Sequence, residues 1–210
     1  MYQASTSEYL LCLRQMPEWS KLLLEENNGK RYNALLKLFI ENNFWVHEEK
    51  IVIKSIAEKS GNSSGNVSKW IKEIYLDILD LNECKPGLFY KQAEIPVNLY
   101  INNYDNYTSF NVSLNLIPRM YESFYFHFIQ AKIGTDMFFV TDVTHNITEN
   151  GKTITINLKG GMYNLYREFS VAKALYEGKI NYLQQFELYD FEIDDIILGR
   201  DRFNKNKTIY

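Results

Sequence analysis

The sequence has few cysteines, no long apolar run and no excess of charge of one sign. Its two cysteines, Cys12 and Cys84, cannot form the disulfide framework of a small secreted protein. No run approaches the roughly 18 apolar residues that a membrane-spanning helix needs. The N-terminus also lacks the basic and apolar regions of an export signal. These absences predict a reduced, soluble, cytoplasmic protein with no membrane association.

The formal net charge of −3 is divided almost evenly along the chain. Residues 1–90 carry 11 basic and 12 acidic side chains, and residues 91–210 carry 12 and 14. Neither part has the strong basic excess of avid, sequence-independent nucleic-acid binders. An apolar fraction of 46% over 210 residues predicts a globular chain of one large domain or two small ones.

The first ninety residues have the pattern of a helical domain. Ser5 and Glu8 form a capping box, in which each side chain satisfies a backbone N–H group at the start of a helix. Pro17 is expected to end this helix and to begin the next, because a proline at the first helical position loses no hydrogen bond. A third helix is expected at residues 31–43. The apolar residues expected on the buried faces are Tyr9, Leu10, Leu13, Trp19, Leu22, Leu23, Leu35, Leu38 and Phe39.

From residue 95 the apolar residues recur at every second position, which is typical of strands with one buried face. Asn150-Gly151 predicts a tight hairpin, since a type I′ turn needs positive φ at both positions, and Gly134 suggests another. The change of period predicts a boundary between a domain of residues 1–90 and a domain of residues 91–210. We expect an antiparallel meander of five strands near residues 96–102, 108–117, 122–132, 136–147 and 152–159.

A long helix is expected after Gly160-Gly161. Its apolar residues recur at helical spacing up to Gly178, which is placed to end the helix. We expect this helix to lie across the apolar face of the sheet. Residues 182–198 have both strand-like and helix-like spacing, so their structure stays open. The residues expected on the buried face of the long helix are Met162, Leu165, Tyr166, Phe169, Ala172, Leu175 and Tyr176.

The outward face of the expected third strand carries Tyr125, His127 and Ile129. This face is unusually aromatic and apolar for one wetted by solvent. Two explanations are open. Residues 182–198 can fold back over it, or a second chain can cover it in a homodimer or a complex with a protein partner.

Residues 51–79 contain the most specific local pattern in the chain. Ala57 lies four residues before Gly61, and Val67 and Trp70 resume the apolar period after that glycine. The small residue lets two helices cross closely, the glycine provides positive φ in the turn, and the apolar residues anchor the second helix. The pattern resembles the helix-turn-helix of bacterial DNA-binding proteins of the tri-helical or winged class.

The resemblance implies that the start of the second helix faces DNA. Serine hydroxyls and helix N-terminal N–H groups bind phosphates, an asparagine can pair with adenine, and lysines reach phosphate or guanine. Ser60 and Asn62, beside the turn glycine, are polar where this motif usually has apolar residues. The implied function is binding of double-stranded DNA in transcriptional control or in maintenance of a mobile element. The implied DNA-facing residues are Ser63, Ser64, Gly65, Asn66, Ser68, Lys69 and Lys72.

Two other functions stay open. Residues 51–79 can form a plain helical hairpin of an adaptor or assembly protein, in which the polar helix start is only a cluster of capping side chains. The second is an enzyme with an unrecognised cleft between sheet and helix. A basic stripe on the surface of Lys54, Lys59, Lys69 and Lys72 favours DNA, whereas an apolar patch there favours a protein partner.

No constellation in the sequence predicts catalysis, a cofactor or a metal site. His47, in His47-Glu48-Glu49-Lys50, lacks the second histidine of a zinc-binding helix. His127 and His145 are expected in neighbouring strands but not opposite each other. No serine, cysteine or paired-carboxylate arrangement supports an enzyme, and Cys12 and Cys84 are expected to be buried as small apolar residues.

Three weaker candidates have simpler structural explanations. Glu192, Asp194 and Asp195 are an acidic patch that can hold a cation or simply be solvated, and Gly160-Gly161 can bind an anion or form a plain turn. Tyr163, Tyr166 and Arg167 can stack with a ligand or belong to the core. The overall prediction is an α+β fold: an N-terminal helical helix-turn-helix domain, then an antiparallel β-meander covered by a long helix.

Overall fold

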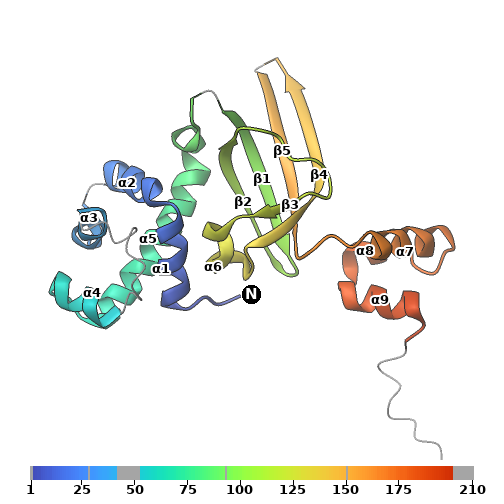
Figure 1. The fold of residues 1–210 in the computed structure, drawn as a ribbon, viewed down its shortest axis with the longest axis horizontal. Helices are drawn as coiled ribbons and strands as arrows, with labels where there is room; N and C mark the ends of the chain where they lie inside the picture. Colours follow the sequence, from blue (N-terminus) through green and yellow to red (C-terminus); the bar gives the residue numbers. More distant parts are fainter. Residues whose placement is uncertain (1, 28, 42–52, 93, 150, 201–210) are drawn as a thin grey trace, which may run out of the picture. The chain divides into compact units, whose positions relative to one another are not determined.

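The computed structural model describes residues 2–27, 29–41, 53–92, 94–149 and 151–200 (Figure 1). The chain divides into two compact units, Met1–Met162 and Tyr163–Tyr210. Helices come first and strands follow, which confirms the α+β class. The unit boundary differs from the one expected near residue 90. The period changes there, but the helices and strands on either side share one hydrophobic core.

The predicted N-terminal helices are present. The Ser5 hydroxyl accepts a hydrogen bond from the Glu8 N–H at 3.3 Å, and the Glu8 carboxylate accepts one from the Ser5 N–H at 2.8 Å, which confirms the capping box. Pro17 is the first residue of the second helix, also as predicted. The helices before the sheet are α1 (Thr6–Gln15), α2 (Pro17–Glu26), α3 (Asn33–Glu41), α4 (Ile53–Ser60) and α5 (Ser64–Cys84), followed by the short 3₁₀ helix η1 (Pro86–Phe89).

The sheet is mixed, so the expected all-antiparallel meander is wrong. Its strand order is β2-β1-β5-β4-β3, and β1 and β5 pair in parallel at the centre, with Asn98 opposite Thr155. The alternation of apolar residues could not distinguish a mixed sheet from an antiparallel meander. It indicates which side chains of a strand are buried, but not which other strand that strand pairs with. The strands are β1 (Ile95–Asn103), β2 (Asn106–Leu114), β3 (Ser123–Tyr125), β4 (Met137–Thr148) and β5 (Gly151–Gly160).

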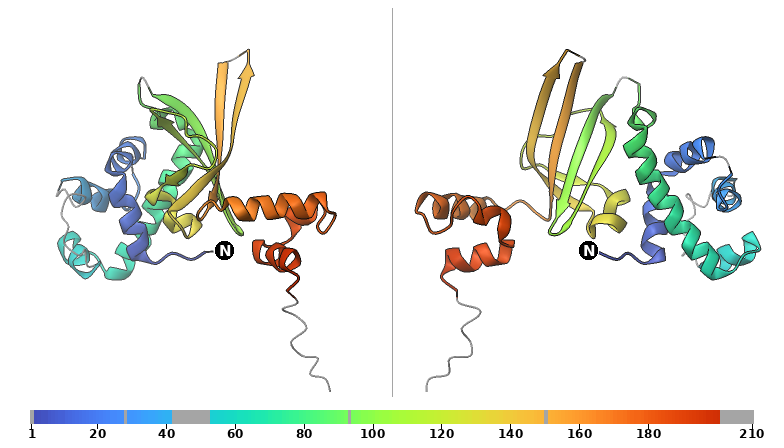
Figure 2. Two further views of the ribbon diagram at one scale, coloured as in Figure 1. Left: turned by 45° about the vertical axis from the view of Figure 1, so that its right-hand side comes forward. Right: turned by 180° about the vertical axis from the view of Figure 1, so that it is seen from behind.

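Both expected glycine turns differ from the prediction. Gly134 has φ +88° and ends the short helix α6 (Gln130–Ile133), so it caps a helix and is not the tip of a hairpin. In the β4–β5 hairpin Thr148 pairs with Gly151. The turn therefore begins at Glu149, one residue earlier than expected; Asn150 lies outside the described residues. Figure 2 shows this hairpin extending past the ends of β1 and β2.

The expected third strand is mostly not a strand. Residues 126–133 leave β3 and form the 3₁₀ helix η2 (His127–Ile129) and then α6. Ile129 is fully buried, whereas Tyr125 and His127 are exposed, so the three side chains do not form one outward face. The outward face that either residues 182–198 or a second chain was expected to cover is therefore not formed.

An aromatic cluster joins the helices to the sheet. The Trp19 ring of α2 lies 4.9 Å from that of Phe110 in β2, and 4.7 Å from that of Phe128 in η2. It also packs on Phe89 of η1 at 5.5 Å. Figures 1 and 2 show α5 beside the sheet and α3 and α4 further from it. The long helix α5 lies beside the sheet, whereas the helix that follows Gly161 belongs to the second unit.

The amide of Asn82 in α5 caps the free edge of the sheet. Its Nδ2 donates to the carbonyl of Asn111 at 2.6 Å, and the Asn111 N–H donates to its Oδ1 at 2.7 Å. β2 is an edge strand, and these two backbone groups point away from β1. A buried amide side chain thus takes the place of a neighbouring strand at this position.

Buried phenols make the first unit sensitive to high pH. Tyr75 in α5 is fully buried and donates a hydrogen bond to the carbonyl of Phe128 at 3.0 Å, and burial raises the pKa of its phenol. Because the pKa of the Tyr75 phenol is higher in the folded state than in the unfolded state, the neutral phenol stabilises the fold. This stabilisation is fully present below the unfolded pKa of about 10 and is lost as pH rises from there through the folded pKa. We expect denaturant midpoints to fall above pH 10 in the wild type, and to fall less steeply in Tyr75→Phe. Equal slopes would contradict this assignment.

The second unit is a small bundle of α7 (Leu165–Tyr176), α8 (Gln184–Glu187) and α9 (Asp190–Leu198). Residues 182–198, left open by the sequence, contain helices and no strand. The unit's core consists of Val171, Ala174, Ile180 and Ile193. The apolar stripe expected on the buried face of α7 is not part of this core; its exposed members are Met162, Leu165, Tyr166, Phe169, Ala172 and Tyr176.

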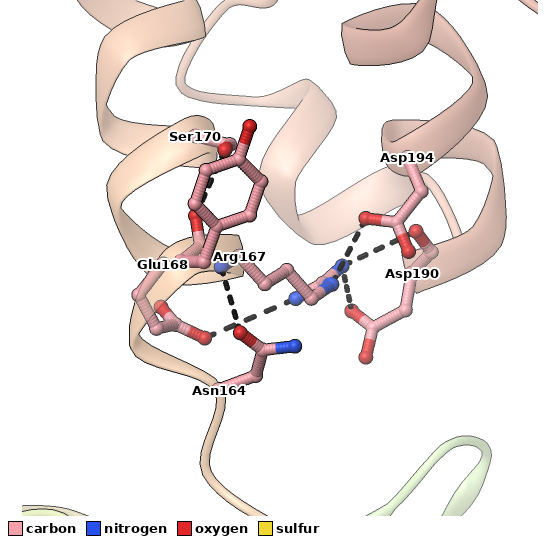
Figure 3. Close-up of polar contacts among 7 residues, drawn as sticks. Asn164, Arg167, Glu168, Ser170, Asp190 and Asp194 are labelled. Carbon is pink, nitrogen blue, oxygen red and sulfur yellow. Dashed lines mark hydrogen bonds and ion pairs between the residues drawn. The ribbon is translucent and has the colours of Figure 1, made fainter.

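Arg167 holds α7 to α9. Its Nε donates to Asp194 at 2.9 Å, and its Nη2 donates to the Asp190 carbonyl at 3.2 Å and pairs with the Asp190 carboxylate at the same distance (Figure 3). Asp194 of the expected acidic patch is therefore paired with a guanidinium. Among the helices of the described residues, none is long and apolar enough to cross a membrane.

Candidate nucleic-acid interface

α4 and α5 are joined by a short turn of residues 61–63. Gly61 has φ +65°, and its N–H donates to the Glu58 carbonyl at 3.3 Å. The Asn62 N–H donates to the Ala57 carbonyl at 3.0 Å. These two bonds form a Schellman motif, which satisfies the last carbonyls of α4 and turns the chain sharply. The left-handed glycine that the sequence predicted is therefore in place.

The polar residues beside the glycine stabilise the turn. The Ser60 hydroxyl donates to the Ala57 carbonyl at 3.2 Å, and the Asn62 amide donates to the Ser60 carbonyl at 2.7 Å. Both side chains are half-buried. They satisfy carbonyls at the helix end, where an apolar residue would leave these groups to solvent.

We expect Gly61→Val to destabilise the first unit by about 1–3 kcal/mol. A Cβ at Gly61 would meet no atom within 4 Å, so the cost comes from the positive φ alone. Gly65 is the matched control, because it also has free space around it but lies in the first turn of α5 without positive φ. Gly65→Ala should be neutral or stabilising. Equal denaturant midpoints for Gly61→Val and the wild type would contradict this prediction.

Apolar residues anchor the two helices to each other and to the core. Ile56 and Ala57 of α4 are buried, as is Val67 of α5, while Trp70 is only half-buried against the core. α3 contacts both α4 and α5, which completes a three-helix arrangement. Val67 thus anchors the second helix as predicted, and Trp70 does so in part.

The predicted DNA-facing residues lie on the exposed start of α5. Ser63 is its N-cap, and the Ser63 hydroxyl accepts from the Asn66 N–H at 3.3 Å. The Lys69 ammonium lies 3.7 Å from Glu73, one turn further along, in an exposed pair. Ser68 is half-buried. The exposed residues of the set are Ser63, Ser64, Gly65, Asn66, Lys69 and Lys72.

The motif differs in charge from the chain as a whole. Residues 53–72 contain four lysines and one glutamate, whereas the whole chain has a net charge of −3. The lysines are all exposed. Basic charge is therefore concentrated on the segment that, according to the resemblance, contacts the phosphate backbone of DNA.

Contacts that the sequence did not suggest hold α5 in place. The Tyr32 hydroxyl donates to Asp77 at 2.5 Å, and the Lys30 ammonium lies 3.0 Å from the same carboxylate. Tyr32 is almost fully buried. Tyr32 precedes α3 and Asp77 lies in the middle of α5, so these bonds join the segment before α3 to α5. No local pattern could predict a pairing between residues so far apart.

A cleft of about 670 Å³ lies between α5, the N-terminal segment and the β1–β2 hairpin. Lys72 lines it together with Lys132 and Asp105. The Tyr2 N–H donates to Asn106 at 2.8 Å, which holds the N-terminal segment against the hairpin. Because charges of both signs line the cleft, its lining does not define one class of ligand.

The remaining candidate sites have structural explanations. His127 of η2 pairs with Asp136, just before β4, at 2.5 Å. His145 is exposed in β4. In the described residues no group of three or more His, Cys, Asp or Glu side chains could hold a metal ion. His47-Glu48-Glu49-Lys50 lies outside those residues.

Gly160-Gly161, which the sequence left open as an anion site or a plain turn, has a packing role. A Cβ at Gly160 would lie 2.4 Å from the Asn103 side-chain oxygen, so the glycine is required by the close approach of β1. Of the cysteines, Cys12 is buried and burial raises the pKa of its thiol to about 11, whereas Cys84 is exposed, so the expectation that Cys84 is buried is wrong.

Comparison of the chain with protein-family models, with curated protein sequences and with solved structures found no match.

Proposed function

We propose that the first unit binds double-stranded DNA through the start of α5, in the cytoplasm, as a transcriptional regulator or a maintenance protein of a mobile element. The observation that carries this proposal is the exposed, polar and lysine-rich beginning of α5, placed after a left-handed Gly61 turn. The opposite side of the same helix is held in the core by Tyr75 and Asn82, so α5 would enter a groove as a rigid element.

Each exposed side chain has a role in this proposal. The hydroxyls of Ser63 and Ser64 and the free N–H groups of the first turn would bind phosphate oxygens. Asn66 would contact an adenine edge in the major groove. Lys69 and Lys72 would neutralise phosphates and release counterions. The protein would act by binding and not by catalysis.

Salt-dependent binding of duplex DNA tests the proposal. We expect Lys69→Ala and Lys72→Ala each to weaken binding and to reduce the magnitude of the slope of log K against log salt by about 1. Lys152→Ala is the control, because Lys152 is also exposed but lies in β5. Fluorescence anisotropy on labelled random duplexes at several salt concentrations measures both quantities.

Two results would contradict the proposal. If the wild type does not bind duplex DNA at low salt, α5 does not function as a recognition helix, and the adaptor function becomes the better explanation. If the wild type binds but both lysine variants keep its affinity and its slope, the DNA interface lies elsewhere on the chain.

A further inference from the structure

α7 is apolar on two opposite faces. Val171 and Ala174 face the core of the second unit, and Arg167, one turn earlier on this side, pairs with α9 (Figure 3). Leu165 and Phe169 each lie two residues from Arg167, which is on that inner face. Two residues correspond to about 200° around a helix, so these side chains lie on the opposite, outer face.

The outer face has the spacing of a helix-pairing seam. Leu165, Phe169, Ala172 and Tyr176 are separated by four, three and four residues, which is the a/d pattern of a heptad. Leu165, Phe169 and Tyr176 are 69%, 65% and 93% exposed. A helix that is apolar on both faces is normally buried on both. The second unit buries only the inner one, so the outer seam lacks a partner within this unit.

The charges beside the seam complement each other between two copies. With Phe169 at an a position, Glu168 is at g and Lys173 is at e. In a parallel pair a g residue meets the e residue five positions later in the other helix, so Glu168 would meet Lys173 on each side of a two-fold axis. An antiparallel pair would place g beside g and e beside e, and no opposite charges would meet.

Both charged side chains are available for this pairing. Within their own helix Glu168 lies 3.9 Å from Arg167, and Lys173 lies 3.7 Å from Glu177. These distances are long and the side chains of Glu168 and Lys173 are 44% and 59% exposed, so both pairs are weak. The seam itself carries no charge and can therefore lie against a copy of itself without repulsion.

We infer that the outer seam of α7 is a self-association surface, on which α7 of a second copy packs in parallel about a two-fold axis. The small size of the unit supports this occupant. It spans residues 163–210, and units near 40 residues often depend on oligomerisation for stability. A two-fold dimer buries the same uncharged face on both copies.

The mass of the full-length chain in solution tests this inference first. We expect a dimer at micromolar concentration by sedimentation equilibrium, and at least an about tenfold weaker dimer in Phe169→Ser. Tyr182→Ser is the matched control, because Tyr182 is 69% exposed in the same unit but lies outside the seam. Circular dichroism establishes that each variant keeps its helices. A monomeric wild type, or a dimer unaffected by Phe169→Ser, overturns the inference.

Charge exchange tests the direction of pairing. Glu168→Lys and Lys173→Glu should each weaken the dimer, and the double variant should restore it, because the opposite charges meet again. A fall in the double variant equal to the sum of the two single effects would exclude the parallel pairing.

A disulfide provides a second test of direction. Ala172 is a d position, so the two Ala172 residues would face each other across the axis of a parallel pair. Ala172→Cys in a Cys84→Ser background should oxidise to a covalent dimer, since the other thiol, Cys12, is buried. Phe191→Cys in the same background is the control for random collision. Equal rates for the two variants would overturn the parallel pairing.

The inference does not rest on DNA binding. A dimer with no affinity for duplex DNA would leave it standing and remove the proposed function. A monomer that binds DNA with the expected salt slope would do the reverse.

Discussion

Replacing Trp19 by alanine should lower the free energy of unfolding of the first unit by about 3–5 kcal/mol, the usual cost of removing a buried aromatic ring. Trp19 is 9% exposed and packs on Phe89, Phe110 and Phe128, which come from η1, β2 and η2. These rings are far apart in sequence, so no neighbouring side chain can refill the space without moving a strand.

The same variant tests whether helices and sheet unfold together. If residues 1–162 form one cooperative unit, circular dichroism at helical and strand wavelengths should give a single denaturant midpoint, lower in Trp19→Ala than in the wild type. Leu11→Ala is the control, since Leu11 is an exposed residue of α1 and its loss should cost less than about 0.5 kcal/mol. Two separate midpoints, only one of them moved, would show instead two domains meeting near residue 90.

Asn82→Leu should destabilise the first unit by about 2–6 kcal/mol. The leucine keeps the volume of the side chain but removes both hydrogen bonds to the Asn111 backbone, and each buried group left without a partner costs about 1–3 kcal/mol. The control is Asn98→Ala. Asn98 donates only to the side chain of Asn111, at 3.1 Å, so its loss leaves the β2 backbone satisfied.

Chemical denaturation measures this difference directly. The Asn82→Leu chain should also form more aggregates, because the uncapped edge of β2 can pair with a strand of another chain. Equal midpoints for Asn82→Leu and Asn98→Ala would mean that water replaces the amide at the edge, and that the cap contributes little to stability.

Features determined by a few neighbouring residues could be predicted from the sequence. The Ser5–Glu8 capping box, the Pro17 helix start and the left-handed Gly61 turn each depend on a local backbone requirement that only certain residues meet. The position at which α5 begins is set by Ser63, whose side chain caps the helix. For this reason the turn and the polar helix start of the candidate site were predictable.

Features determined by distant partners could not be predicted. Phe126 and Phe128 alternate with other residues as in a strand, yet residues 127–129 form η2. In this conformation both phenylalanine rings pack on Trp19, which lies more than 100 residues earlier in the sequence. The same limit applies to the Asp77 contacts that hold α5. The stripe on α7 was correctly identified as apolar, but its period could not show whether the partner belongs to the same chain.

The parallel pairing of β1 with β5 has a consequence for how the chain is made. β5 is the last strand to be synthesised, yet it occupies the centre of the sheet, and its partner residues in β1 precede it by more than fifty positions. The two hairpins are local and can form quickly, but the contact that joins them has a high contact order and must form late. Until residue 160 leaves the ribosome, the inner edge of β1 is open to strands of other nascent chains. Expression should therefore depend on chaperones and on synthesis rate, and any fragment that ends before residue 151 should be recovered mainly as aggregate.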